Sequence, residues 1–244
     1  MAWSPDNAAS AYLETIRLCK LDHQRRYTCS RHSEPHSTEF IAALAAGMNS
    51  KLILEVSPSA APTTIALAAA ARQTGGRLIC ILSDPNALHD AMVAMTELSL
   101  SAVVEFVIGD AKEIAPRYTN VDFALVDCKE DDYIGIMNCI DLNPSCAVVV
   151  ADNLMDRKAS TAYGNFVKKR MDASSISLPI GKGIEVTRFS GAEQSRRPFK
   201  DAENTRCSDM ARRLNKRDVV KAKKTGKVRF IIEAEEHNGG MDWF

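Results

Sequence analysis

The sequence predicts a doubly wound α/β fold built on a mostly parallel sheet. Apolar runs of strand length alternate with helical segments through the middle of the 244-residue chain, which is the pattern of repeated strand–helix–strand units. After the fifth such run the pattern changes to two strands around a turn, which predicts a closing antiparallel hairpin. We therefore expect seven strands in one sheet.

Two amphipathic helices are predicted before the first strand. Ser4 and Pro5 suit a helix start, and apolar residues at helical spacing continue to about Lys20. A polar, aperiodic stretch follows from His23 to Thr38, and helical spacing returns over residues 39–48. The second helix should therefore lie directly before the sheet.

Strands and helices then alternate in sequence. We expect parallel strands over residues 52–56, 78–82, 103–108, 123–126 and 147–151, helices over 63–73, 86–98, 112–116, 133–139 and 159–172, and hairpin strands over 176–178 and 184–189. This organisation assigns residues 1–50 to N-terminal helices and a lid loop, 51–190 to the α/β domain, and 191–244 to a C-terminal extension.

The composition is typical of a soluble globular protein, with 45% hydrophobic and 25% charged residues. No stretch reaches the roughly 18 uninterrupted apolar residues of a membrane span, so we expect no membrane association. The seven cysteines are scattered without tight spacing, which indicates free thiols in a reducing compartment. These features predict a cytoplasmic protein.

The C-terminal extension is strongly basic. Residues 196–229 hold thirteen Lys and Arg against four Asp and Glu, a net charge of +9 in a chain whose total charge is zero. The tract from Arg212 to Arg217 could direct the protein to the nucleus, bind nucleic acid or bind a protein partner. A solvated basic face is the commoner explanation, and the tract lacks the interleaved aromatics that stack on bases, which disfavours nucleic acid. Residues 228–234 could add a short strand.

Carboxylates follow two neighbouring strands of the predicted sheet. Ligands of open parallel sheets bind beyond the carboxyl ends of the strands. Asp127 and Asp152 lie one strand–helix–strand step apart, so their side chains should project side by side. With the Asn153 carbonyl they make a three-oxygen set suited to a hard divalent cation. A single Asp after a strand is more often a cap, but the combination favours the cation site.

Small polar residues follow the first and third predicted strands. Glu55 opens a turn of small residues that leads into a helix N-terminus, where free N–H groups attract an anion. No glycine occurs between Gly47 and Gly75, so a plain loop is equally consistent with this turn. Gly109-Asp110-Ala111 follows the third strand.

Residues of the types that bind zinc gather near the N-terminus. Cys19, His23, Cys29, His32 and His36 lie within 18 residues. Their spacing matches no established finger pattern, so a polar lid loop is the preferred interpretation and zinc the alternative.

Several of these motifs resemble a known enzyme family. Residues 122–133, DFALVDCKEDDY, are similar to the fourth-strand motif of caffeoyl-coenzyme-A and catechol-type O-methyltransferases. ADNL at 151–154 resembles their fifth-strand motif, and LPIGKGI at 178–184 their closing hairpin. Over its whole length the chain resembles a plant family of methyltransferase-like proteins, through the opening MAWSP and residues 64–76.

The resemblance implies a class I methyltransferase fold, which is Rossmann-like, with S-adenosylmethionine (SAM) as cofactor, Mg²⁺ or another divalent cation, and a small hydroxylated acceptor. It implies that the cation ligands are Asp127, Asp152 and Asn153, and that the catalytic residues are Lys129 and Asp127. It implies cofactor contacts from Glu55, Ser57, Ser59, Asp84, Gly109, Asp110 and Ala111.

The residues that would contact the cofactor depart from the family pattern at two places. The first turn has Ser57 and Ala61 where the family has glycines, and their side chains narrow the space for a cofactor. The acid that ends the family's second strand and holds the ribose falls at Leu82, which leaves Asp84 two residues late.

A third departure concerns catalysis. Glu130 occupies the position of the family's catalytic lysine, with Lys129 one residue before it, and in an extended segment one residue reverses the direction of a side chain. Together the departures favour an alternative function, that of a catalytically inactive methyltransferase-fold protein that binds or regulates a partner. The oligomeric state stays open, with a homodimer as one alternative.

Overall fold

The computed structural model describes residues 3–25, 37–60, 62–127, 133–154, 157–169, 172–181 and 183–190. The described strands are β1 (Leu52–Ser57), β2 (Arg77–Leu82), β3 (Val104–Ile108), β4 (Phe123–Asp127), β5 (Cys146–Asp152), β6 (Ala173–Leu178) and β7 (Ile184–Ser190). They form one sheet in the order β3-β2-β1-β4-β5-β7-β6. The first five are parallel, and β7 runs antiparallel between β5 and β6. The predicted fold is confirmed.

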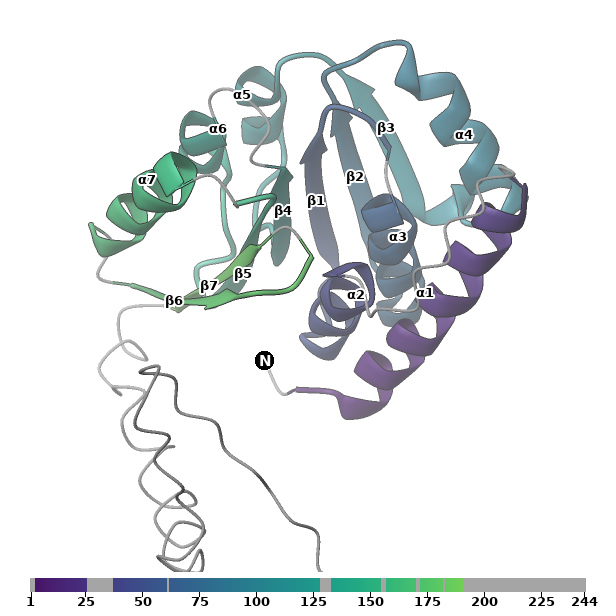
Figure 1. The fold of residues 1–244 in the computed structure, drawn as a ribbon, viewed down its shortest axis with the longest axis horizontal. Helices are drawn as coiled ribbons and strands as arrows, with labels where there is room; N and C mark the ends of the chain where they lie inside the picture. The colour runs from purple at the N-terminus through teal and green to yellow at the C-terminus, as the bar shows by residue number, and fades with distance from the viewer. Residues whose placement is uncertain are drawn as a thin grey trace, which may run out of the picture. The chain divides into compact units, whose positions relative to one another are not determined.

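Helices cover both faces of this sheet (Figure 1). The α-helices are α1 (Pro5–Arg25), α2 (Ser37–Gly47), α3 (Pro62–Thr74), α4 (Ala87–Glu97), α5 (Ala111–Ile114), α6 (Tyr133–Cys139) and α7 (Arg157–Lys168). Two 3₁₀ turns, η1 (Ser101–Val103) and η2 (Ala115–Arg117), complete the described elements.

Side chains alternate between two hydrophobic cores on the two sides of the sheet. In β1, Ile53 packs with α1 to α4, whereas Leu54 and Val56 pack with α5, α6 and α7. Successive strand residues point to opposite faces, so a strand buried on both faces is apolar throughout. This is why the apolar runs of the sequence predicted the parallel strands within one or two residues of their observed bounds.

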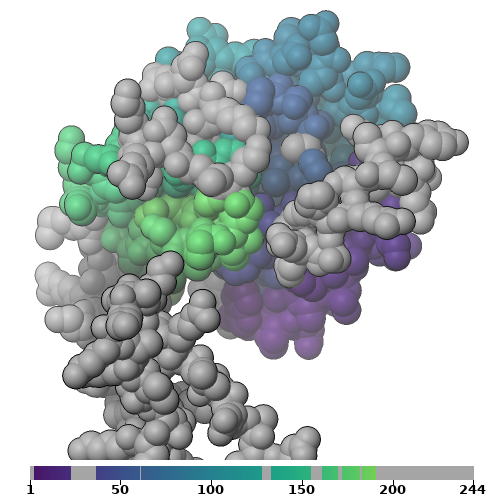
Figure 2. Space-filling view, viewed as in Figure 1, coloured from purple at the N-terminus to yellow at the C-terminus, as the bar shows by residue number. Residues whose placement is uncertain are grey.

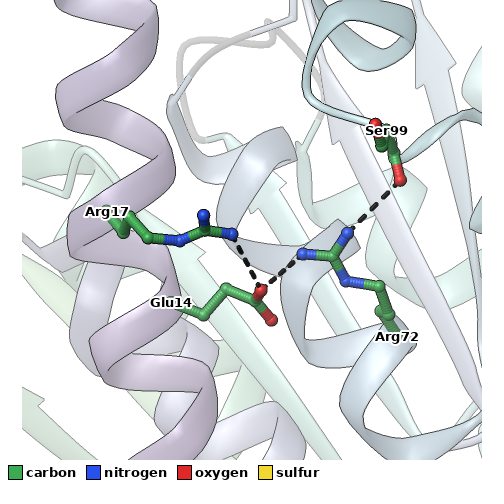
Figure 3. A network of polar contacts seen from close by, with 4 residues as sticks. All are labelled: Glu14, Arg17, Arg72 and Ser99. Atoms are coloured by element: carbon green, nitrogen blue, oxygen red, sulfur yellow. Dashed lines mark hydrogen bonds and ion pairs between the residues drawn. The ribbon is translucent and has the colours of Figure 1, made fainter.

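The N-terminal helices pack on the face that carries α3. The backbone N–H of Ser4 donates to the Gly47 carbonyl, which joins the start of α1 to the end of α2. Farther along α1, Glu14 accepts from Arg72 of α3 at 2.5 Å, and Arg72 also donates to the Ser99 carbonyl after α4 (Figure 3). The space-filling view shows α1 at the surface on one side of the molecule, in purple, and the hairpin strands on the other, in green (Figure 2). The N-terminal helices are therefore part of the α/β unit.

Three elements differ from their predicted bounds by more than two residues. Helix α7 spans Arg157–Lys168, whereas the prediction was residues 159–172. Helix α1 continues to Arg25 rather than Lys20, because no Gly or Pro interrupts the polar residues after Lys20. Strand β6 begins at Ala173 rather than Ile176, since the ladder with β7 extends through two serines that are exposed. Backbone pairing does not need apolar side chains, so the sequence pattern did not mark this extension.

Several predictions fall outside the described residues. They concern the lid loop over 26–36, the segment with Lys129 and Glu130, and everything after Ser190, including the strand over 228–234 and the basic tract. Within the described part of the chain, no helix is long and apolar enough to cross a membrane.

Candidate functional site

The carboxyl ends of β4 and β5 bring two acidic residues together. Asp127 and Asp152 are register partners at the last position of the parallel ladder, and both side chains are half-buried. Parallel neighbours in register project their side chains to the same face. The structure therefore places these two carboxylates side by side at one rim, as the sequence predicted.

Asn153 joins this pair through two hydrogen bonds. Its side-chain Nδ2 donates to Asp127 Oδ1 at 2.7 Å, and its backbone N–H donates to Asp152 Oδ1 at 2.8 Å. The backbone of Asn153 is left-handed, with a φ of 62°, a conformation that Asn adopts more readily than most residues. The next residue, Leu154, donates its N–H to the Gly183 carbonyl, which ties this loop to the β6–β7 turn.

This group has the chemistry of a hard-cation site. Two carboxylates and an amide oxygen are ligands that Mg²⁺ accepts alongside water. A cation held by all three residues would take the place of the hydrogen bond between Asn153 and Asp127. In the described ranges, no group of three or more His, Cys, Asp or Glu side chains is placed to hold a metal ion.

Glu55, at the carboxyl end of β1, is a buried acid. Its side chain is 0% exposed. Thr63 Oγ1 donates to Oε1 at 2.8 Å, and Cys80 Sγ lies 3.4 Å from Oε2. Burial, helped by the nearby charge of Asp127, raises the pKa of Glu55 to about 7 against the hydrogen bonds that lower it. Glu55 is therefore a neutral or half-ionised group near physiological pH.

The turn after β1 is held at both ends by hydrogen bonds. Ser57 is buried, and its hydroxyl donates to the Ser59 carbonyl at 3.0 Å. The N–H of Asp84, after β2, donates to the Pro58 carbonyl at 3.2 Å. Ala61 lies outside the described residues. Ser57, one of the residues that replace the glycines of a typical nucleotide-binding turn, thus takes part in a hydrogen bond within the turn.

The ends of β2 and β3 supply the remaining predicted cofactor residues. Asp84 is exposed, and its carboxylate accepts from both the backbone and the side chain of Asn86. Gly109 has a φ of 141°, which glycine adopts without strain. Asp110 caps α5 by accepting from the Lys112 N–H at 2.8 Å. These residues therefore lie along the same edge of the sheet as Asp127 and Asp152.

The predicted zinc group is described only in part. Cys19 is half-buried on α1, and burial, with the charges of Glu39 and Asp22, raises the pKa of its thiol to about 12. The side chain of His23, and Cys29, His32 and His36, lie outside the described residues.

Sequence reasoning missed two residues of the Glu55 cluster. Thr63 stands at the start of α3 and Cys80 within β2. Thr63 was visible as a hydroxyl residue eight positions after Glu55, near the expected helix start. Cys80 gave no signal, because its contact with Glu55 depends on the register of β1 against β2.

Several solved structures with the same fold are methyltransferases. The chain is similar to an O-methyltransferase from Bacillus cereus in complex with SAH (15% identity, 72% of this chain and 90% of that one, TM-score 0.58). It is also similar to the O-methyltransferase TomG from Streptomyces achromogenes in complex with SAM (20% identity, 74% and 90%, TM-score 0.54). A third is a methyltransferase from Geobacter sulfurreducens (19% identity, 72% and 88%, TM-score 0.54).

These likenesses establish the fold, a class I methyltransferase fold with an antiparallel C-terminal hairpin. No curated protein matches the chain by sequence. A family model does match it, over residues 1–208. The chain therefore belongs to the family described as Protein of unknown function (DUF1442).

Proposed function

We propose that this protein is a SAM-dependent methyltransferase that methylates a hydroxyl group of a small acceptor with the help of a divalent cation. The observation that carries the proposal is that Asp127 and Asp152 lie side by side at the carboxyl ends of β4 and β5, and that Asn153 donates a hydrogen bond to each of them. Solved structures of the same fold, which include O-methyltransferases in complex with SAM or SAH, support it.

The ends of β1, β2 and β3 would bind the cofactor. The turn with Ser57 and Ser59 leads into α3, whose N-terminus would attract the carboxylate of SAM. Gly109, Asp110 and Ala111 would border the adenine. Asp84 is the acid closest in sequence to the expected ribose position, and its exposed carboxylate leaves it open to solvent.

The acceptor would bind beside the two rim carboxylates. SAM supplies an electrophilic methyl group on sulfur, and a divalent cation would lower the pKa of the acceptor hydroxyl. Asp127, Asp152 and Asn153 would orient the acceptor oxygen toward the methyl carbon. Lys129, in its neutral form, is the residue proposed to take the hydroxyl proton as the oxygen–carbon bond forms and the sulfur–carbon bond breaks, and Asp127 would assist through the cation that it would hold.

One observation favours a second candidate function. The strand residues that lead into the turn after β1 are closed to solvent, with Ser57 3% exposed and Glu55 0% exposed. A protein that kept the fold but lost methyl transfer would bind a ligand or cation at the rim, and its basic C-terminal region would contact a protein partner.

Isothermal titration calorimetry distinguishes the two functions. SAM is titrated into the full chain in the absence and in the presence of Mg²⁺. If the protein is the proposed enzyme, SAM should bind, and Mg²⁺ should tighten its binding because the cation and the cofactor would occupy adjoining sites. If the protein is catalytically inactive and does not use the cofactor, SAM should give no heat of binding under either condition.

A matched variant identifies the site in the same experiment. Asp127→Asn removes a rim charge, whereas Asp141→Asn removes an exposed charge next to the start of β4, at the opposite edge of the sheet. The Mg²⁺ effect should disappear in the first variant and persist in the second. If the effect of Mg²⁺ on SAM binding were lost equally in both variants, the assignment of the cation site to Asp127, Asp152 and Asn153 would be contradicted.

A further inference from the structure

A cluster of polar side chains surrounds Glu55 beneath the turn after β1. Glu55 and Cys80 are register partners on neighbouring strands, and both are buried among apolar residues. Buried polar groups must be hydrogen-bonded or they destabilise the fold. The contacts of this carboxyl therefore indicate its role.

Both carboxyl oxygens of Glu55 are occupied by donors from other elements. Thr63 Oγ1, in the first turn of α3, donates to Oε1 at 2.8 Å. Cys80 Sγ, on β2, lies 3.4 Å from Oε2, and the Thr64 hydroxyl also bonds to the carboxyl. One side chain thus connects three elements, β1, β2 and α3.

The same cluster extends into the turn itself. Cys80 interacts with the Ser57 hydroxyl as well as with Glu55. Ser57 in turn donates to the Ser59 carbonyl at 3.0 Å. A continuous chain of polar contacts therefore runs from the helix start, through Glu55 and Cys80, to the backbone of the turn.

We propose that Glu55 is a positioning residue, whose buried carboxyl holds the first turn of α3 and strand β2 together and so fixes the shape of the β1–α3 turn without contacting a bound ligand. In this role Glu55 acts through Thr63 and Cys80. It sets the direction of the first turn of α3, whose N-terminus would receive an anionic part of a ligand.

Direct contact between Glu55 and a ligand is the competing role. Glu55 has no solvent exposure, and both of its oxygens already accept hydrogen bonds. Contact with a cationic ligand would also need an ionised carboxyl, which burial disfavours. The geometry thus favours the positioning role.

A double-mutant cycle in urea unfolding tests the contact itself. Glu55→Met keeps the approximate length of the side chain but removes both of its oxygens, and Thr63→Val keeps the shape of the threonine while removing its hydroxyl. Each variant should raise the unfolding equilibrium constant about tenfold, since each leaves a buried polar group without its partner. The double variant should also show about a tenfold rise, because the contact is already lost. A hundredfold rise would mean independent residues and would overturn the proposal.

Thr96→Val is the matched control. Thr96 lies on α4, and its hydroxyl donates to the Met92 carbonyl at 2.8 Å, outside the cluster. Its effect should add to that of Glu55→Met without coupling. If Glu55→Met does not fold, the cycle is measured between Thr63→Val and Cys80→Ala, which should couple through the retained Glu55. Additivity there would also overturn the proposal.

SAM affinity distinguishes positioning from direct contact, and this part rests on the proposed function. Positioning predicts that Glu55→Met and Thr63→Val weaken SAM binding by similar factors of about tenfold and that the double variant is no weaker. Direct contact predicts that Thr63→Val leaves the affinity unchanged. If the wild-type protein does not bind SAM, the proposed function fails, while the unfolding cycle still decides whether Glu55 holds the turn.

Discussion

Glu55 links the folded state to pH through its burial. Its usual pKa is 4.5, and burial raises the pKa to about 7 in the folded protein. Between these values the folded chain holds a proton that the unfolded chain has released. The contribution of Glu55 to the free energy of unfolding is therefore fully present below about pH 4.5. It falls as the pH rises to about 7 and then levels off, with a total loss of about 3 kcal/mol.

Urea unfolding of the wild type and of Glu55→Gln at pH 5, 6, 7 and 8 measures this loss. The wild type should lose stability over the interval, and the variant should lack that contribution because its amide does not titrate. Parallel pH profiles for the two proteins would show that Glu55 does not carry the effect.

Asp122 illustrates a residue whose role is structural. It is 4% exposed, and its carboxylate accepts from the backbone N–H groups of Lys51 and Leu52 and from Asn143 Nδ2, at 2.8, 3.1 and 2.7 Å. Asp122→Ala leaves three donors without a partner and should lower the free energy of unfolding by about 3 kcal/mol. Differential scanning calorimetry measures the change, and Asp122→Asn, which keeps one acceptor oxygen, should lose less. Equal losses would argue against this account.

At the scale of elements, replacing two glycines by alanine should have opposite effects on stability. A Cβ on Gly76, at the entry to β2, would lie 2.6 Å from the Lys51 carbonyl oxygen and 2.8 Å from that of Ser50. A Cβ on Gly164, inside α7, would meet no atom within 4 Å. Gly76→Ala should therefore destabilise the protein by about 2 kcal/mol, whereas Gly164→Ala should stabilise it by about 1 kcal/mol.

Thermal unfolding by circular dichroism checks this pair. The unfolding temperature should fall for Gly76→Ala and rise for Gly164→Ala. A fall of similar size in both variants would mean that the close approach of the two backbones at Gly76 is unimportant.

Most elements were predictable because burial on both faces makes a strand apolar throughout. The convergence of Asp127 and Asp152 was predictable for a related reason, since parallel strands end at one edge. The burial of Glu55 was not predictable, because its partner Cys80 lies 25 residues away in the sequence and contacts it only through the register of β1 against β2. The full length of β6 was not predictable either, as backbone pairing, not side-chain pattern, fixes it.

At the scale of the whole molecule, residues Met1–Ser195 form a compact unit that contains every described residue. A chain that ends at Ser195 should therefore retain the sheet and both hydrophobic cores. Its unfolding temperature should lie within about 4 °C of the full chain, which corresponds to about 1 kcal/mol. Circular dichroism measures both properties, and loss of cooperative unfolding would show that the unit depends on the residues after it.

Binding of Mn²⁺, followed by electron paramagnetic resonance in the presence of SAH, tests the central claim most directly. Mn²⁺ favours the same oxygen ligands as Mg²⁺. The account predicts one Mn²⁺ site per chain, with affinity at least about tenfold weaker in Asp152→Asn, where one buried charge contact of the ion is lost, and unchanged in Asp141→Asn. Equal affinity in all three proteins, or no bound Mn²⁺ in the wild type, would contradict it.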